Sequence, residues 1–274
     1  MIKPFDFNIH LVPREDLNLK NQLEANITVE DAITIYNSFR LEAIKFLSGM
    51  NIMIFNTSAV YSLNYIEKLY KYLSKDFPGK LAFTQLIPFK KPVKTDYLKK
   101  AKLFGLKGIK FHNYVQDISK KNWGDILSWA LAAQEEGLFI CIDTSYGSNK
   151  MYISDNLAMA AWLSEHIKKV PIILLHSGGL RCFEAFLLAD SCQNIWLETS
   201  FSYNYYENTS IQKFFFEIYK KLSSNRIIYA SDYPALGIKD NIKKFSDLLK
   251  NYKFNNSSID KIMFKNASEI LNIN

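Results

Sequence analysis

The fold is decided by segments such as Trp123-Gly-Asp-Ile-Leu-Ser-Trp-Ala-Leu-Ala-Ala-Gln-Glu-Glu-Gly-Leu-Phe-Ile-Cys-Ile-Asp143. Up to Glu136, apolar residues recur at helical spacing among polar ones, which predicts an amphipathic helix. Gly137 stands where this helix should stop, and the apolar run 139–143 predicts a strand that is covered on both faces. A helix that leads straight into such a strand is typical of βα units around a parallel sheet.

The same alternation runs along the whole chain. Helices are predicted near residues 28–48, 63–75, 95–104, 123–136, 155–169, 181–191, 210–222 and 238–252, with a last one after residue 258. Strands are predicted at residues 5–10, 52–57, 81–87, 108–111, 139–143, 172–176, 195–199 and 226–230. Eight βα units predict an α/β fold, a (β/α)8 TIM barrel, as a single domain over residues 1–274. The alternative, an open doubly wound sheet, would need a glycine-rich phosphate turn after the first strand, where this chain has Pro13-Arg-Glu-Asp16.

The amino-acid composition limits the cellular compartments and the classes of partner that we expect for this protein. The 274 residues include 34 Lys and Arg, 27 Asp and Glu, and 48 % hydrophobic residues, an ordinary globular mixture with a net charge of +7. No apolar run reaches the roughly 18 residues of a membrane span, and the first ten residues lack the apolar core of a signal peptide. Three cysteines outside any CxxC spacing favour a reducing compartment. We expect a cytoplasmic protein with a small-molecule substrate and with neither a nucleic-acid nor a membrane partner, since its paired lysines are dispersed over helices and loops.

Polar residues gather at the predicted C-terminal ends of the strands, where TIM barrels carry their chemistry. Three of the four histidines stand there, and the residues at these ends include Asn8, His10, His112, Asp143, His176 and Asp232. Alternate residues of a strand share a face, so Asn8 points the same way as His10. If these faces point inward, the group converges on one pocket, where imidazole and carboxylate would suit Zn²⁺ or a similar divalent ion. The alternative is a set of unrelated polar groups.

Several stretches resemble the amidohydrolase superfamily, in particular the branch that includes aminocarboxymuconate-semialdehyde decarboxylase. The matching stretches occur in the family's order: Phe5-Asp-Phe-Asn-Ile-His-Leu11, Gly105-Leu-Lys-Gly-Ile-Lys-Phe-His112, Ile173-Leu-Leu-His-Ser-Gly-Gly179, Asn194-Ile-Trp-Leu-Glu-Thr-Ser200, Arg226-Ile-Ile-Tyr-Ala-Ser-Asp-Tyr-Pro234 and Asn266-Ala-Ser-Glu-Ile-Leu271. The family's fold is a (β/α)8 barrel, which agrees with the strand count. The resemblance implies a metal-dependent hydrolase that acts on a small, anionic molecule through a metal-activated water.

The resemblance also implies a ligand set for a divalent metal, zinc by ligand type. His10 matches the second histidine of the family's first-strand pair, His176 the sixth-strand histidine, and Asp232 the eighth-strand aspartate. Asp143 stands where the fifth-strand histidine is expected, and Asn8 where the first histidine of the pair is expected. Asn is a weak, neutral oxygen ligand for zinc. Two alternatives therefore stay open: a metal site formed by His10, Asp143, His176 and Asp232, or a barrel that has lost its metal.

Catalytic roles are predicted for Asp232, His176 and Lys110. Asp232 would take the proton of the activated water and later give it to the leaving group. Lys110 stands near the position of a fourth-strand lysine that is carbamylated in binuclear relatives. The alternative for Lys110 is an ion pair with Asp143 or with an anionic substrate, which we favour.

Substrate binding is predicted for His112, Arg181 and Asn8. Arg181 opens a helix after the Gly178-Gly179 turn, and backbone N–H groups at a helix start favour an anion, although a tight turn would equally need small residues. The tyrosine-rich loop 201–207 would form a pocket lid or a contact between two copies in a homodimer, and residues 11–27 a polar loop over the top of the barrel.

Two further functions stay open on the same scaffold. In a decarboxylase or other lyase, the metal and Lys110 or Arg181 would hold a carboxylate while charge develops on carbon. In a catalytically silent barrel, Lys110, Asp143 and His10 would form an internal network without a metal ion.

Overall fold

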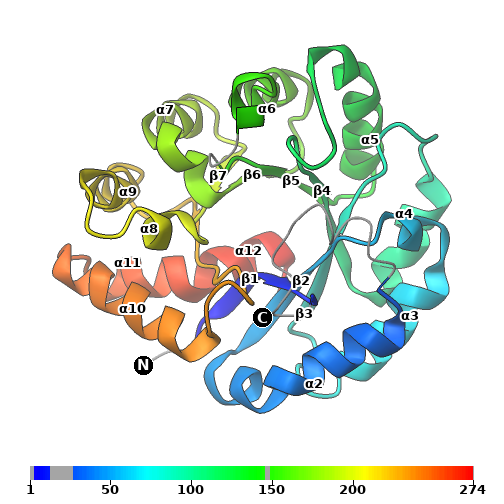
Figure 1. Ribbon diagram of the computed structural model, residues 1–274, viewed down its shortest axis with the longest axis horizontal. Helices are drawn as coiled ribbons and strands as arrows, with labels where there is room; N and C mark the ends of the chain where they lie inside the picture. The colour runs from blue at the N-terminus through cyan, green and yellow to red at the C-terminus, as the bar shows by residue number, and fades with distance from the viewer. Residues whose placement is uncertain (1–2, 13–26, 146–148, 274) are drawn as a thin grey trace.

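Eight parallel strands form one sheet, in chain order, with helices around it (Figure 1). The computed structural model describes residues 3–12, 27–145 and 149–273. The strands are β1 (Phe5–His10), β2 (Gly49–Ile54), β3 (Leu81–Leu86), β4 (Leu106–Phe111), β5 (Phe139–Asp143), β6 (Ile172–Leu175), β7 (Ile195–Glu198) and β8 (Ile227–Ile228). The predicted loop over the top of the barrel falls mostly on residues 13–26, outside the described residues.

Hydrogen bonds between the first strand and the last segment of the sheet close the barrel. The Phe7 N–H donates to the Tyr229 carbonyl at 3.2 Å, and the His10 N–H donates to the Tyr233 carbonyl at 2.8 Å. Ile9 and Tyr233 also form an isolated parallel bridge. The predicted TIM barrel is therefore confirmed.

The helices fall close to their predicted places. They are α2 (Val29–Phe46), α3 (Leu63–Leu73), α4 (Thr95–Ala101), α5 (Trp123–Glu135), α6 (Asn156–His166), α7 (Cys182–Ser191), α8 (Ser202–Tyr205), α9 (Ser210–Lys221), α10 (Ile238–Asn251), α11 (Asn256–Asp260) and α12 (Asn266–Leu271). Thr28 and Asp31 form a capping box at the start of α2, which satisfies backbone N–H groups that the helix leaves open. No helix in the described part of the chain is long and apolar enough for a membrane crossing.

Some element boundaries differ from prediction for local reasons. β2 begins at Gly49, ahead of the predicted residue 52, because its pairing with β1 already starts at Phe5 opposite Gly49. It ends at Ile54, and the 3-10 turn Thr57–Tyr61 follows. The predicted loop 201–207 contains the short helix α8.

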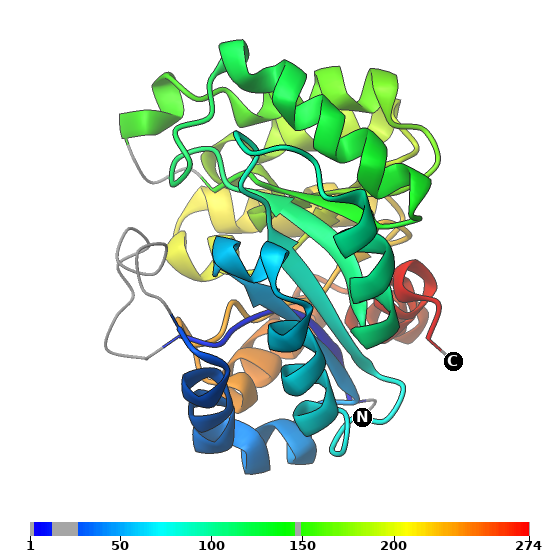
Figure 2. The ribbon, with the colours of Figure 1, turned by 90° about the vertical axis from the view of Figure 1, so that its right-hand side faces the viewer.

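Two apolar layers hold the barrel together. The outer layer joins the helices to strand residues such as Ile9, Ile52 and Phe83, and the inner layer fills the barrel with residues such as Phe7 and Phe139. α12 contributes Ala267 and Leu271 to the inner layer. Figure 2 places this helix at one end of the barrel and α8 at the other.

A β-bulge in β1 orients the first candidate residues. Asp6 pairs with Met50 and Ile9 with Ile52, so both Phe7 and Asn8 face the single residue Asn51. Such an extra residue shifts the alternation of the strand by one. Phe7 lies in the inner layer, Ile9 lies in the outer layer, and Asn8 and His10 consequently lie on the barrel's inner side.

Candidate active site

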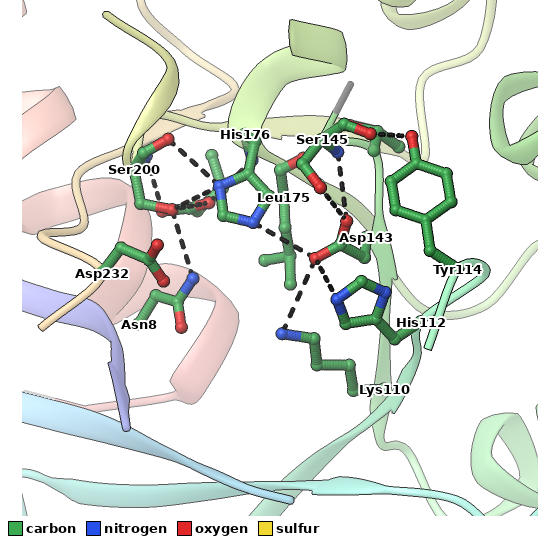
Figure 3. A network of polar contacts seen from close by, with 12 residues as sticks. Asn8, Lys110, His112, Tyr114, Asp143, Ser145, Leu175, His176, Ser200 and Asp232 are labelled. Atoms are coloured by element: carbon green, nitrogen blue, oxygen red, sulfur yellow. Dashed lines mark hydrogen bonds and ion pairs between the residues drawn. The ribbon is translucent and has the colours of Figure 1, made fainter. Parts of the chain in front are cut away.

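The carboxylate of Asp143, at the end of β5, is the centre of a buried polar group (Figure 3). Its Oδ2 lies 3.2 Å from His176 Nε2, 3.4 Å from His112 Nε2 and 4.0 Å from Lys110 Nζ. Its Oδ1 accepts hydrogen bonds from the backbone N–H and the hydroxyl of Ser145, at 3.1 and 2.6 Å. The C-terminal ends of three neighbouring strands, β4, β5 and β6, thus converge on one carboxylate.

The charges of this group are set by burial and by Asp143. Burial alone would raise the pKa of Asp143, but His112, His176 and Lys110 outweigh it and hold the pKa well below its usual range. Burial would lower the pKa of His176, but Asp143 outweighs it and raises the pKa to about 9. For His112 burial prevails and lowers the pKa to about 4. At neutral pH an imidazolium at His176 therefore faces the Asp143 carboxylate, beside a neutral His112.

His176 uses both of its ring nitrogens. Nε2 faces Asp143, while Nδ1 lies 3.1 Å from the Ser200 hydroxyl and 3.2 Å from the Ser200 carbonyl oxygen. An imidazolium has two N–H donors and no acceptor, so these oxygen partners suit the protonated ring. Asn8 extends the chain of contacts, because its Nδ2 donates to the Ser200 hydroxyl at 3.2 Å.

Asp232 and His10 form a second pair where the barrel closes. His10 Nε2 lies 3.5 Å from Asp232 Oδ1. Burial alone would raise the pKa of Asp232, but the hydrogen bond from His10 and the positive charge of His176 outweigh it and lower the pKa. The Asp232 side chain is 18 % exposed, against 3 % for Asp143, so Asp232 is the more accessible carboxylate.

A buried carboxylate for which the sequence predicted no role, Glu198 on β7, supports His176. Glu198 Oε2 accepts hydrogen bonds from the His176 N–H at 3.0 Å and from the Ser200 hydroxyl at 2.8 Å. His176 has a φ of 66°, a left-handed conformation that is costly for a residue with a side chain. The signal was present in the sequence, because Glu198 follows Trp196 at the spacing of one strand face, inside an otherwise apolar run.

Asp6 on β1, for which the sequence also predicted no role, supports the turn that carries Asp232 in a similar way. Asp6 Oδ1 accepts hydrogen bonds from the Ser231 N–H at 3.0 Å and the Asn8 N–H at 3.3 Å. Its Oδ2 is buried without a hydrogen-bond partner, and burial raises the pKa of the carboxyl to about 7. Asp232 follows Ser231 with a left-handed φ of 59°. In both left-handed turns that carry site residues, a backbone N–H group thus donates a hydrogen bond to a carboxyl group of the neighbouring strand.

The structure does not bring Arg181 to this group. Its guanidinium contacts Asp155 at 3.0 Å and Glu184 at 2.7 Å on the surface. Gly178 and Gly179 have positive φ angles of 82° and 51° and form the tight turn that precedes it. The other five residues predicted for catalysis and substrate binding lie at the catalytic end of the barrel: Asn8, Lys110, His112, His176 and Asp232. The two remaining predicted metal ligands, His10 and Asp143, lie there with them.

The predicted metal ligands come in two pairs, His10 with Asp232 and His176 with Asp143. Across residues 3–12, 27–145 and 149–273, no three His, Cys, Asp or Glu side chains form a group able to hold a metal ion. Zinc sites use at least three protein ligands. The four residues as arranged therefore do not fit a zinc ion, and the ligand set stays a prediction.

The family of the chain follows from its sequence. The sequence pattern of the amidohydrolase family matches residues 51–273, which include seven of the eight strands in whole or in part. The chain belongs to the amidohydrolase family. This membership supports a general amidohydrolase-type function. No curated protein matches the chain in sequence.

Solved structures share the fold over the whole chain. An uncharacterised TIM-barrel protein from Bordetella bronchiseptica is 14 % identical with a TM-score of 0.71, covering 99 % of each chain. A probable 2-pyrone-4,6-dicarboxylic acid hydrolase from Acinetobacter baumannii, with citric acid bound, is 14 % identical with a TM-score of 0.66, covering 99 % of this chain and 100 % of the other. Dihydroorotase from Campylobacter jejuni is 13 % identical with a TM-score of 0.62, covering 99 % and 84 %. At such identities the likeness shows the fold.

Proposed function

We propose that the protein is a hydrolase that cleaves an ester, lactone or amide bond in a small anionic molecule, with Asp232 as the general base. The observation that carries this proposal is the contrast between the two carboxylates at the catalytic end. Asp143 is enclosed by Lys110 and two histidines, whereas within the described residues Asp232 forms an ion-pair contact with His10 alone and has a more accessible carboxylate. A general base must reach the proton that it removes.

The reaction would proceed by two proton transfers through Asp232. Its carboxylate takes a proton from a water molecule as the oxygen of that water attacks the carbonyl carbon of the substrate. The bond from this carbon to the leaving oxygen or nitrogen then breaks, and Asp232 returns the proton to the leaving group. His10 holds the carboxylate in place from the neighbouring strand.

The positive groups of the site favour an anionic substrate. The Lys110 ammonium and the His176 imidazolium lie beside one buried carboxylate, Asp143, and their charges also act on Asp232. The Lys110 ammonium also lies 4.8 Å from the centre of the Phe55 ring, a neutral neighbour. A carboxylate on the substrate would be attracted by these two cations in a site of low dielectric constant.

The resemblance to the amidohydrolase superfamily is the only ground for including a divalent metal ion in this proposal. Such an ion would lower the pKa of a bound water. Metal analysis of the purified protein, prepared with added zinc, tests this part. One ion per chain would support the metal-dependent version, and no bound ion would end it.

The hydrolase proposal is tested with a panel of small carboxylated lactones, esters and amides, with products identified by mass spectrometry. We expect turnover by the natural chain and its loss in Asp232→Asn. Equal turnover by Asp232→Asn would overturn the assignment of the base. Release of carbon dioxide in place of a hydrolysis product would identify a lyase.

The ion pair of Lys110 with Asp143 favours a second candidate, the catalytically silent barrel. In that case the polar group would serve only stability. The internal network differs from the predicted one, which joined Lys110, Asp143 and His10. His10 contacts Asp232 instead, whereas the partners of Asp143 include His112 and His176. A silent barrel would turn over no member of the panel, and strong chelators would leave its melting temperature unchanged.

A further inference from the structure

A cavity of about 720 Å³ lies at the end of the barrel away from Asp232. It is formed where the end of α9, the start of β8 and the C-terminal helical segment meet. Its lining is Asp190, Gln193, Trp196, Lys221, Leu222, Ser223, Asn225, Arg226, Lys261, Lys265, Asn266 and Glu269. In Figure 2 the red helix α12 lies at this end of the barrel, opposite α8.

Basic side chains predominate in this cavity. Lys221, Arg226, Lys261 and Lys265 line it together with only two acidic residues, Asp190 and Glu269. Cations lining one concave surface raise the local concentration of anions. The four basic residues outnumber the two carboxylates of this lining, which favours an anionic ligand.

Backbone carbonyls hold Arg226 in place, and the charge of Asp190 acts on it from beyond ion-pair distance. Its Nη1 donates to the backbone carbonyls of Ala189, Cys192 and Ile195, the last two at 3.0 Å. Within the described residues, its Nε and Nη2 have no hydrogen-bond partner and no carboxylate lies within ion-pair distance. A guanidinium fixed through one nitrogen leaves a rigid pair of donors, which is the geometry that binds a carboxylate or phosphate through two oxygens.

Two further side chains complete the site. Lys221 forms no hydrogen bond or ion pair with any described residue, so its ammonium is available. Trp196 comes from the inner layer of the barrel and is 8 % exposed, which gives the cavity one apolar aromatic surface. Lys261 and Lys265 have partners of their own, Asn225 at 2.6 Å and Asp260 at 4.0 Å.

We propose that this cavity binds a small organic anion with two carboxylate or phosphate groups. Arg226 receives one group through Nε and Nη2, and Lys221 receives the other. The volume lies within the roughly 300–1,000 Å³ that small-molecule sites occupy. TIM barrels carry their chemistry at the opposite end, so this is a binding site apart from the proposed hydrolase site.

The test is calorimetric titration of the whole chain with succinate and, separately, with inorganic pyrophosphate at low ionic strength. We expect one site with a dissociation constant below about 1 mM. A carboxylate site will prefer succinate, and a phosphate site will prefer pyrophosphate. No binding of either anion would overturn the proposal.

A matched pair of variants locates the site. Lys221→Gln should weaken binding about tenfold, the effect of removing one charge-assisted hydrogen bond. Lys220→Gln removes the neighbouring lysine, whose ammonium lies 5.5 Å from the Phe254 ring centre, and should leave binding unchanged. Equal binding by both variants would contradict the assignment.

Binding at the proposed catalytic site is distinguished with Lys110→Gln. Retained affinity in this variant, together with loss in Lys221→Gln, supports the cavity. The reverse pattern would place the anion at the catalytic end and overturn the proposal. If Lys110→Gln does not fold, the comparison of Lys221→Gln with Lys220→Gln still shows whether the anion binds in the cavity.

Discussion

His10 Nε2 lies 3.5 Å from Asp232 Oδ1 across the seam where the first strand of the barrel meets the last. The two residues are separated by most of the sequence, and closure of the barrel brings them together. The Asp232 N–H donates to the Asn8 carbonyl at 3.0 Å, so the backbone of the seam fixes the distance between the two side chains. The β1 bulge is also required, because it turns His10 inward.

Replacing Asp232 by Asn should remove most of the proposed hydrolase activity. The amide keeps the size of the side chain but cannot accept the proton of the attacking water, so kcat should fall by about 10²- to 10⁴-fold with little change in KM. Steady-state kinetics on the best substrate of the panel measures this. Asp125→Asn, on the exposed face of α5, is the control and should keep full activity. An Asp232→Asn chain as active as this control would contradict the prediction.

Replacing Asp143 by Asn should destabilise the barrel. It leaves the cations of His176 and Lys110 buried without their carboxylate, and breaking a buried ion pair costs about 3–5 kcal/mol. Denaturant titration gives the free energy of unfolding. Asp117→Asn breaks the exposed pair with Lys150 and should cost less than about 1 kcal/mol. Equal losses in the two variants would show that Asp143 is not the counter-ion of a charged group.

The sequence was sufficient to predict the barrel because its strands are continuous apolar runs between amphipathic helices. Strand ends were harder, and β8 covers only Ile227–Ile228 of the predicted 226–230. Residues after Ile228 reach β1 through single hydrogen bonds and an isolated bridge, which a run of apolar residues does not reveal.

The sequence predicted that the site residues lie at the ends of strands, but it did not predict which of them contact each other. His10 faces Asp232 and His176 faces Asp143 because β1 adjoins β8 and β5 adjoins β6. Glu198 lies at the end of a strand like the other site residues, but its partners are two backbone N–H groups and the Ser200 hydroxyl, which the pattern of side chains does not reveal. Arg181 follows a turn that suits an anion, but it forms ion pairs with Asp155 and Glu184 on the surface and so does not reach the site.

Glu198 should act as a positioning residue for His176. Glu198→Ala leaves the buried N–H groups of His176 and Ser200 without their acceptor, at about 1–3 kcal/mol for each unsatisfied group. Glu198→Gln retains one acceptor oxygen and should recover part of this loss. Unfolding free energies rank the two variants, and the chemical shift of the His176 ring reports the turn. An unchanged ring shift in Glu198→Ala would show that Glu198 does not position His176.

Asp6 should make the barrel less stable as the pH rises from about 4 to about 7. Its carboxyl has a pKa of about 7 in the folded chain, against about 3.9 when unfolded. Between these values the folded chain binds more protons than the unfolded chain, so the free energy of unfolding falls with rising pH, by on the order of 4 kcal/mol, and is level outside this window. Other buried groups titrate too, so the difference between the natural chain and Asp6→Asn is the measured quantity.

In Asp6→Asn this contribution should vanish, because the amide oxygen still accepts from Ser231 and carries no proton. Unfolding free energies from pH 4 to pH 8 measure the two curves. The Asp125→Asn control should run parallel to the natural chain. If the Asp6→Asn curve is also parallel, Asp6 does not titrate in this range.

Gly178 should resist substitution for two separable reasons. Its φ is +82°, and a Cβ atom added there would lie 2.6 Å from the Cβ of Ala185. A left-handed conformation alone costs about 1–2 kcal/mol for a residue with a side chain. Gly178→Ala should therefore lower the free energy of unfolding by more than this. Gly124→Ala, where nothing lies within 4 Å on helix α5, should instead raise stability by about 0.5–1 kcal/mol.

The double variant Gly178→Ala with Ala185→Gly separates overlap from backbone strain. Ala185→Gly removes the overlapping atom but leaves the positive φ, so the double variant should lose less stability than the two single variants together. Contacting residues typically show such coupling at about 0.5–3 kcal/mol. Strictly additive losses would mean that α7 moves aside, and that only the left-handed backbone makes this turn require glycine.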